Sequence, residues 1–364
     1  MTIKADRQKL AEFCREVFQA AGLEAQHAAT VSDNLMEAEL RGVRSHGLIQ
    51  VKNYVDGLKS GAINKNPRIK VLKETPGTLL IDGDLAPGSA SGGYAMAKCI
   101  EKARETGVAS AAVKNGTHFG MAASYAMTAL PHDMLGFAFC NAKPRIAVHG
   151  SIDKNVGTNP VCVAIPADRQ YPVVYDAATS KTAYNKVLYA FREGQKIEKG
   201  LALDEAGDET DDPATALNGA FLPFGGYKGS GLAIVVNVLC SLLTGTAIQP
   251  GAETQELQED PWKIGFYFSA VDIAAFQDPK LFKKSVDLMI TRLKSSRKKD
   301  GQEIYMPGEL EYLSHAEQSA HGISLGEAIW SDLKALGREL ALSFKVEDCV
   351  YPPCASNSVQ AGTQ

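Results

Sequence analysis

The sequence predicts a mixed α/β protein in which a central mixed sheet is joined by helical elements at both ends of the chain. The chain has 364 residues, 45% of them hydrophobic and 22% charged, which is typical of globular proteins and too long for one small core. Apolar residues follow helical spacing over about the first sixty residues. Strand-like and helix-like segments then alternate over about two hundred residues, as in a sheet covered by helices.

Residues 1–66 are expected to form an N-terminal helical segment. Asp6 is placed to cap a helix that runs to Ala21, with its apolar residues on one face. A second amphipathic helix is predicted to stop near Gly42. A third helix follows the sequence SHG and is predicted to end at Gly61.

Residues 67–309 are expected to form a mixed α/β region that binds cofactor and substrate. Predicted strands lie in RIKVLKETPGTLLIDGD, VASAAVKNGTHFG, LGFAFCNA, GTNPVCVAIPA, PVVYDAATS, KIGFYFSAVDI and QEIYMPGELE. Predicted helices lie in SGGYAMAKCIEKARETG, MAASYAMTALPHDM, TAYNKVLYAFREG, GLAIVVNVLCSLLTGTA and the basic segment ending in RLKSSRKKDG. The apolar GLAIVVNVLCSLLTGTA is short for a membrane span and is expected to be a buried helix. LALDEAGDETDDPATALNGA shows little periodicity and is expected to be an exposed excursion.

Residues 310–346 are expected to form a C-terminal helical segment that packs with the N-terminal helices. Its predicted helix is SLGEAIWSDLKALGREL. The tail, residues 347–364, is rich in Pro, Ser, Asn, Gln and Gly and is expected to be disordered.

Charge and cysteine usage narrow the partners and the compartment. The net charge of −4 and the absence of a basic stripe argue against a nucleic-acid partner. The start of the chain lacks the apolar region of a secretion signal. Seven scattered cysteines without a CxxC pair indicate reduced thiols. A cytoplasmic protein with no membrane partner is expected.

Several common catalytic motifs are missing from the sequence. It has no G-x-G-x-x-G fingerprint between a strand and a helix, no Walker-A loop and no G-x-S-x-G elbow. It also has no HExxH pair or metal-spaced His/Cys cluster, so no metal site is predicted. Rossmann-type dinucleotide enzymes, kinases, zinc enzymes and serine hydrolases all lose support.

Two of the seven histidines stand in small, polar, glycine-flanked turns. His46 lies in RSHG after a predicted helix, and His118 lies in NGTHFG after a predicted strand. A single histidine is more often structural, but such junctions are where catalytic groups collect on a rigid scaffold. Because imidazole titrates near neutrality, either ring could transfer a proton while a hydride moves to or from carbon.

Three further loops could line a ligand. PFGGYKGSGLA places Lys228 among glycines just before a helix, where backbone N–H groups and a cation could hold an anion. A tight turn with an exposed lysine is the competing interpretation. VGTNP, which contains Thr158 and Asn159, and DAATS could line a ligand or could be ordinary turns.

Six motifs in the same order resemble the type-2 malate/L-lactate dehydrogenase family: RGVRSHG, NGTHFG, GTNP, DAATS, PFGGYKGSGLA and MPGE. The likeness covers roughly Asp6 to Val346. Relatives include sulfolactate and ureidoglycolate dehydrogenases, diketogulonate reductase and Δ1-piperideine-2-carboxylate reductase. The resemblance implies a non-Rossmann fold, a homodimer and NADH or NADPH in an extended cleft.

The resemblance also implies roles for particular residues. His46 matches the acid/base histidine of several members, and His118 matches the proton acceptor of the ureidoglycolate enzyme. The implied cofactor-binding set, to which the two residues of the VGTNP turn are added, is Thr158, Asn159, Asp176, Ala177, Ala178, Lys228, Pro307, Gly308 and Glu309. Which histidine transfers the proton stays open.

Three positions depart from the family pattern and bear on the substrate. The family arginine that suits a substrate carboxylate is Gln50 here, so the contact would weaken or move to Arg44, Lys52 or Arg145. Ser45 is a further candidate substrate contact. A serine that touches the cofactor in some members is Ala142 here, and the usual A-R-G-K reads Ala183-Tyr184-Asn185-Lys186.

The favoured hypothesis is an NAD(P)H-dependent oxidoreductase acting on a small 2-oxo or 2-hydroxy carboxylic acid. A first alternative is the reduction of a cyclic imino acid such as Δ1-piperideine-2-carboxylate or Δ1-pyrroline-2-carboxylate. A second, of another class, is a catalytically weak NAD(P)-binding dimeric relative. Retention of both histidines and Lys228 argues against the second alternative.

Overall fold

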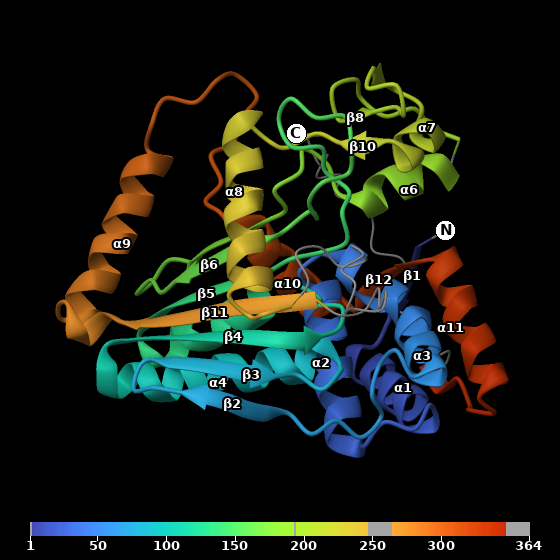
Figure 1. The fold of residues 1–364 in the computed structure, drawn as a ribbon, viewed down its shortest axis with the longest axis horizontal. Helices are drawn as coiled ribbons and strands as arrows, with labels where there is room; N and C mark the ends of the chain where they lie inside the picture. The colour runs from blue at the N-terminus through green and yellow to red at the C-terminus, as the bar shows by residue number, and fades with distance from the viewer. Residues whose placement is uncertain (1, 193, 247–263, 347–364) are drawn as a thin grey trace.

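A mixed sheet forms the centre of the computed structural model, which describes residues 2–192, 194–246 and 264–346 (Figure 1). Its strand order is β2-β3-β4-β11-β5-β6-β7. The strands are β2 (Lys70–Glu74), β3 (Thr78–Asp82), β4 (Val108–Gly116), β5 (Met134–Cys140), β6 (Val161–Ile165), β7 (Val173–Ala177) and β11 (Ile264–Asp272). The pair β3–β4 is parallel and the other neighbours are antiparallel, which confirms the predicted mixed α/β class.

The core of the sheet is built around β11, which comes from late in the chain and lies between β4 and β5. Phe266 and Phe268 alternate along β11 and pack against Phe119 and Tyr125, with ring centroids 4.6 to 5.7 Å apart. Helix α4 (Gly88–Thr106) buries Met96, Cys99 and other apolar residues in the same core. Offset and edge-on aromatic packing of this kind adds to the stabilisation from burial.

A second core joins the two ends of the chain. It contains apolar residues of α1 (Arg7–Ala20), α2 (Ala25–Leu40), α3 (Val51–Ser60) and α11 (Glu327–Glu339). As predicted, the Asp6 side chain caps α1 by accepting a hydrogen bond from the Lys9 N–H, and Gly61 ends α3 in a left-handed conformation. In Figure 1 these helices lie together beside one end of the sheet.

Both terminal segments also contain elements that the sequence analysis did not assign. Strand β1 (Thr2–Ala5) pairs antiparallel with β12 (Ile323–Gly326), and helix α10 (Glu309–His321) precedes β12. Four-residue strands are too short to show a period. Helix α10 was missed because its one fully buried residue is polar, Gln318, so it lacks the apolar stripe that predicts a helix. The strand predicted in QEIYMPGELE is wrong.

The polar segment 201–220, expected to be an exposed excursion, instead belongs to a small lobe. The lobe contains α6 (Tyr184–Arg192), which was predicted as a helix, α7 (Pro213–Asn218) and a sheet of β8 (Ala202–Leu203), β9 (Glu209–Thr210) and β10 (Ala220–Phe221). The buried residues Ile146, Val187, Ala216 and Phe221 contribute to a core of its own. The prediction was wrong because two-residue strands leave no periodicity in a sequence.

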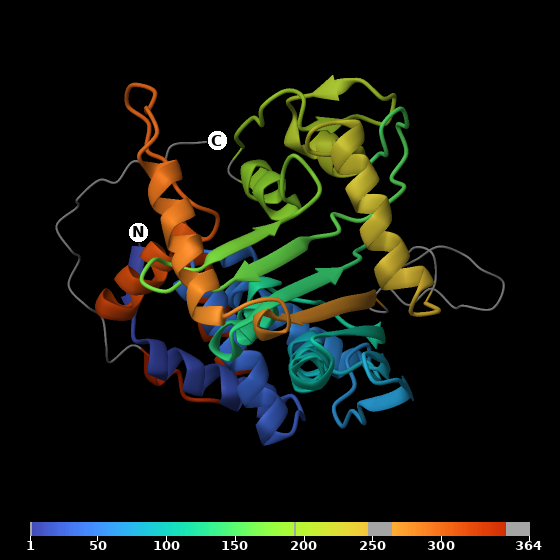
Figure 2. The same cartoon turned by 90° about the vertical axis from the view of Figure 1, so that its left-hand side faces the viewer.

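Helix α8 (Tyr227–Asn237) continues into the π-helix η4 (Val238–Leu242). Together they run from the lobe to the first residues of β11 (Figures 1 and 2). The prediction of a buried helix is wrong for one face, where Ile234, Val235, Val238 and Leu242 are 44–52% exposed. The opposite face is tied to the sheet, since the Asn159 amide donates to the Ala233 carbonyl at 2.9 Å.

The remaining described elements complete the frame of the sheet. They are α5 (Ala123–Ala126) and the 3-10 helix η3 (Met127–His132), predicted as one helix, the 3-10 turn η5 (Ile273–Ala275), and α9 (Pro279–Lys294). Five described cysteines are buried and free, as predicted; Cys349, Cys354 and the rest of the 347–364 tail lie outside the described residues. Among the described helices, none has the length and apolar character needed to cross a membrane.

Candidate active site

A cavity of about 750 Å³ opens where the N-terminal helices, the sheet and the lobe meet. This volume lies within the range of small-molecule and cofactor sites. Its lining residues come from segments far apart in the chain: Arg41, Val43, Ser45, His46, Gln50, Asn53, His118, Gly120–Ala123, Ala142, Lys143, Arg145, Thr158, Pro160, Val174–Ala178, Ala183–Asn185, Ile264, Pro307, Gly308 and Glu311.

The two predicted histidines meet in this cavity. Their rings stack with centroids 5.7 Å apart and planes 8° from parallel. His46 Nδ1 lies 2.9 Å from the Ser45 hydroxyl, and His118 Nδ1 lies 2.7 Å from the Tyr54 hydroxyl. Because each Nδ1 is engaged, Nε2, which has no hydrogen bond to the described residues, is the nitrogen available to a ligand.

Burial keeps both imidazoles neutral at physiological pH. Removal of water lowers the pKa of His46 to about 4. The same effect, together with a smaller contribution from the nearby His46, lowers the pKa of His118 to about 3. Burial also raises the pKa of Tyr54, so its phenol stays protonated and can donate to His118. Each neutral imidazole can therefore accept a proton.

The loop that carries His118 is held by close backbone packing. A Cβ at Gly88, the first residue of α4, would lie 2.1 Å from the His118 carbonyl oxygen, so α4 packs directly on this loop. Gly120 has φ +77°, a left-handed conformation that favours glycine. The Tyr125 hydroxyl donates a short hydrogen bond to the Phe119 carbonyl. This packing keeps the imidazole in place.

Amide side chains hold the turn that carries His46. The Gln50 amide donates to the Ser45 carbonyl at 2.8 Å, and the Asn185 amide donates to the same oxygen at 3.2 Å. The Asn53 amide in turn donates to the Gln50 side-chain carbonyl at 2.9 Å. The side chain of Gln50, which stands where the family resemblance implies an arginine, is therefore engaged in hydrogen bonds that stabilise the turn.

Of the four candidate substrate contacts, two line the cavity and two lie outside it. Ser45 and Arg145 line the cavity, and the Arg145 guanidinium lies 3.4 Å from the centroid of the Tyr184 ring. Arg44 and Lys52 are exposed and lie outside the lining, and Lys52 pairs with Asp56 at 2.7 Å. Lys143, which the sequence analysis did not single out, also lines the cavity.

Most of the candidate cofactor residues lie together. Thr158, Asp176, Ala177, Ala178, Pro307 and Gly308 all line the cavity. Asn159 is buried behind it and accepts a hydrogen bond from the Ala142 N–H at 3.1 Å. Glu309 pairs with Lys294 and accepts from the Met306 N–H, so it shapes the turn. Lys228 is exposed in the first turn of α8, outside the lining, and its cofactor role stays a prediction.

A tight turn packed on β7 and small side chains form one wall of the cavity, which leaves room beside them for a ligand. Gly308 has φ +85°, and a Cβ there would lie 2.8 Å from the Val174 side chain, so its turn packs directly on β7. The Val174 N–H also donates to the Pro307 carbonyl at 2.9 Å. Ala142, Ala177 and Ala178 leave the rest of this wall open.

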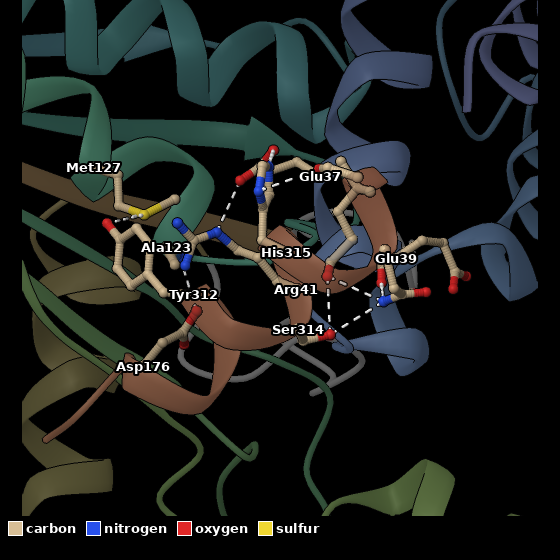
Figure 3. A network of polar contacts seen from close by, with 12 residues as sticks. Glu37, Glu39, Arg41, Ala123, Met127, Asp176, Tyr312, Ser314 and His315 are labelled. Atoms are coloured by element: carbon tan, nitrogen blue, oxygen red, sulfur yellow. Dashed lines mark hydrogen bonds and ion pairs between the residues drawn. The ribbon is translucent and has the colours of Figure 1, made fainter. Parts of the chain in front are cut away.

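Oppositely charged groups line the cavity near α10 (Figure 3). Arg41 is 5% exposed, bonds Glu37 at 2.8 Å and lies 4.3 Å from the centroid of the Tyr312 ring. The Asp176 carboxylate accepts from the Ala123 N–H at 2.8 Å. Its side chain is exposed toward the cavity, and the protein that surrounds it on the other sides raises its pKa to about 6 by partial desolvation. The sequence analysis missed Arg41 because its partners come from α2 and α10.

A dinucleotide-sized cavity with two neutral imidazoles and adjacent cations, on a sheet without the Rossmann fingerprint, defines the site of a non-Rossmann oxidoreductase. Comparison with known proteins agrees. The model of the malate/L-lactate dehydrogenase family matches residues 5–334. The chain therefore belongs to this family, and it is a dehydrogenase that acts on CH–OH groups.

Individual relatives are similar over almost the whole chain. L-Sulfolactate dehydrogenase of Methanocaldococcus jannaschii is 35% identical over 96% of this chain and 100% of its own length. Its solved structure has a TM-score of 0.86 and covers 96% and 99% of the two chains. Malate dehydrogenase of Pyrococcus abyssi is 33% identical, covering 93% and 96%. The structure of Δ1-piperideine-2-carboxylate reductase of Pseudomonas syringae is 28% identical, with a TM-score of 0.82, covering 92% and 99%.

Tyr54 is expected to position His118 without touching a ligand, since it lies outside the lining. Tyr54→Phe should lower kcat about tenfold, the effect of one hydrogen bond, and leave the Kd of the nicotinamide cofactor unchanged. Tyr267→Phe is the matched control, because its hydroxyl bonds Ser110 within the sheet. Steady-state kinetics and cofactor fluorescence titration measure both quantities. Equal kcat in the two variants would contradict this role.

Proposed function

We propose that this protein oxidises a small 2-hydroxy carboxylic acid of the malate, lactate or sulfolactate type, or reduces the matching 2-oxo acid, with NAD or NADP. The observation that carries the proposal is the stacked pair of neutral imidazoles, each anchored through Nδ1, in one cavity with Arg145 and Lys143. The relatives named sulfolactate and malate dehydrogenase support this substrate class.

The chain's own residues supply the proton chemistry. A nicotinamide cofactor, when bound, would supply the acceptor for the hydride that leaves C2 of the hydroxy acid. Nε2 of His46 or His118 takes the hydroxyl proton, so the C–O bond becomes a carbonyl and charge balances. In the reverse direction the same imidazole returns the proton to the carbonyl oxygen. Their neutral state suits the oxidation at physiological pH.

The cofactor would lie against the wall of small residues. Thr158, the Asp176–Ala178 segment and the Pro307–Gly308 turn would hold it, while Asn159 and Glu309 keep neighbouring turns in shape. The nicotinamide would then share one cavity with both histidines. The choice between NAD and NADP is left to the assay below.

The substrate carboxylate is assigned to Arg145. Stacking on Tyr184 orients its guanidinium toward the cavity, and a planar guanidinium can bind a carboxylate through two hydrogen bonds. Lys143 adds a second positive charge. Gln50 is engaged with Ser45, so of the three cations considered for this role only Arg145 lines the cavity.

Two other functions are to be tested beside this one. Reduction of a cyclic imino acid would use the same hydride, proton and carboxylate contacts, and the likeness to the piperideine-2-carboxylate reductase structure favours including it. A catalytically weak NAD(P)-binding relative would bind cofactor without turnover. The ordered stack of His46 and His118 argues against it.

Oxidation of reduced nicotinamide should be followed with NADH and NADPH on pyruvate, oxaloacetate, a sulfonated oxo acid, a diketo sugar acid and piperideine-2-carboxylate. His46→Ala and His118→Ala, singly and together, should reduce turnover at least about a hundredfold in the variant that removes the proton-transfer group. His132→Ala, at an exposed histidine, should match wild type. Cofactor binding without any turnover would contradict the proposal.

The pH dependence follows from the lowered histidine pKa. A group with a pKa of about 4 is protonated only in acid, so kcat/KM for reduction should fall as pH rises above 5. Oxidation needs the neutral ring, so its kcat/KM should persist from about pH 5 upward. Parallel pH profiles in both directions check these opposite trends.

Arg145→Gln should raise KM for the acid and lower kcat/KM about tenfold to a hundredfold, because one charge-assisted contact is lost. Arg145→Lys should recover part of this loss. Lys52→Gln, at an exposed lysine outside the cavity, is the matched control. An unchanged KM in Arg145→Gln would place the carboxylate elsewhere.

We also propose that a second copy of this chain covers the exposed face of α8 and η4. The segment Gly231–Leu243 contains no charged residue, so the face can meet its own copy across a two-fold axis without repulsion between like charges. Large exposed apolar patches mark protein interfaces. The family resemblance implies a homodimer, so a second copy of this chain is the partner expected to cover this face.

Val235→Glu, in the middle of this face and 52% exposed, should shift the protein from dimer toward monomer in sedimentation velocity. Leu72→Glu is the control, since Leu72 on β2 is similarly exposed at 48% but lies on another surface. A mass that stays dimeric in Val235→Glu would exclude this face as the interface.

A further inference from the structure

A buried carboxyl lies directly beneath the turn that carries His46. Glu39, near the end of α2, is 3% exposed and lies outside the cavity lining. Its Oε1 accepts a hydrogen bond from the Leu48 N–H at 2.7 Å, two residues after His46. An acidic side chain is seldom buried unless it has a specific partner.

Gly47 leaves the space that this carboxyl occupies. A Cβ built on Gly47 would lie 2.2 Å from Glu39 Oε1, 2.6 Å from Cδ and 2.8 Å from Cγ. The φ of Gly47 is −95°, which is not a left-handed value, so the close approach of Glu39 is the contact that limits the side chain at this position. The glycine of the SHG turn is instead required by contact with Glu39.

We propose that Glu39 is a positioning residue for His46, which holds the turn from Ser45 to Leu48 through the Leu48 N–H and the space left by Gly47. It touches neither cofactor nor substrate. The inference rests on the proposed function only in that His46 takes part in turnover. The turn is thus held on both sides, by Gln50 and Asn185 at the Ser45 carbonyl and by Glu39 at Leu48.

The strength of this support should depend on pH. Burial raises the pKa of Glu39 to about 7, while the Leu48 N–H and the charge of Arg44 act in the opposite direction. Cys14 of α1 also faces it, and its thiol stays protonated because burial and Glu39 both raise its pKa. The ionised carboxylate accepts the stronger hydrogen bond, so the turn should be held more firmly above neutrality.

A double-mutant cycle between positions 39 and 47 tests the contact. Gly47→Ala is made in wild type, in Glu39→Gln, which keeps the side-chain volume, and in Glu39→Ala, which removes the three atoms nearest to the new methyl. Gly47→Ala should lower kcat at least about tenfold in the first two backgrounds and less than about twofold further in the third. Cofactor Kd should not change.

Two further readouts separate positioning from general stability. In Glu39→Ala the imidazole NMR signals of His46 should shift while those of His132 stay in place, whether or not substrate is turned over. The ratio of wild-type to Glu39→Gln kcat should rise between pH 6 and 8, as the wild-type carboxyl ionises. This ratio cancels the titration of the histidines, which both proteins share.

The outcomes are distinct. An equal cost of Gly47→Ala in all three backgrounds, or unshifted His46 signals in Glu39→Ala, would overturn the role of Glu39 even if turnover and the histidine variants behave as proposed. If no panel acid is turned over, the proposed function fails, and the His46 signals still decide the role of Glu39. If Glu39→Ala does not fold, a lowered kcat in Glu39→Gln, with a wild-type to variant ratio that rises between pH 6 and 8, supports the role, and wild-type kcat in that variant overturns it.

Discussion

The geometry of the site depends on the insertion of β11 between β4 and β5. Both neighbours run antiparallel to β11, so both end at the edge where β11 begins at Ile264. The loop with His118 follows β4, and the loop with Lys143 and Arg145 follows β5. One strand from late in the chain therefore separates the loop with His118 from the loop with Lys143 and Arg145. Its backbone is also locked to η4, since a Cβ at Gly265 would lie 1.7 Å from the Cys240 carbonyl.

Desolvation shifts the pKa of four ionisable groups at or beside the site. It keeps His46 and His118 neutral and makes the carboxyls of Asp176 and Glu39 harder to ionise than usual. A bound anionic substrate would reverse part of this effect on the imidazoles, because a nearby negative charge favours the protonated ring. Binding of an anionic substrate would therefore change the pKa of the imidazoles and, with it, their ability to transfer a proton.

Sequence patterns predicted what depends on long periodic segments and on composition. The three N-terminal helices and the longer strands were predictable, while a site shared by His46 and His118 was implied by the family resemblance. The lobe, β1 and β12 were not, because strands of two to four residues carry no period. Tyr54 and Glu39 were missed for another reason: each acts through a contact between elements, and a tyrosine or glutamate on an amphipathic helix gives no sign of its partner.

The departures from the family pattern are connected in space, which bears on whether the site has decayed. Gln50 and Asn185 donate to the same Ser45 carbonyl, and Tyr184 supports the Arg145 guanidinium. Unrelated losses would leave unpaired polar groups rather than shared hydrogen bonds, since buried amides without partners are destabilising. The Gln50 amide, where the family resemblance implies an arginine, is therefore used in the turn that carries His46, while Tyr184 stacks on the guanidinium of another arginine in the same cavity. Such complementarity argues against a site that has decayed.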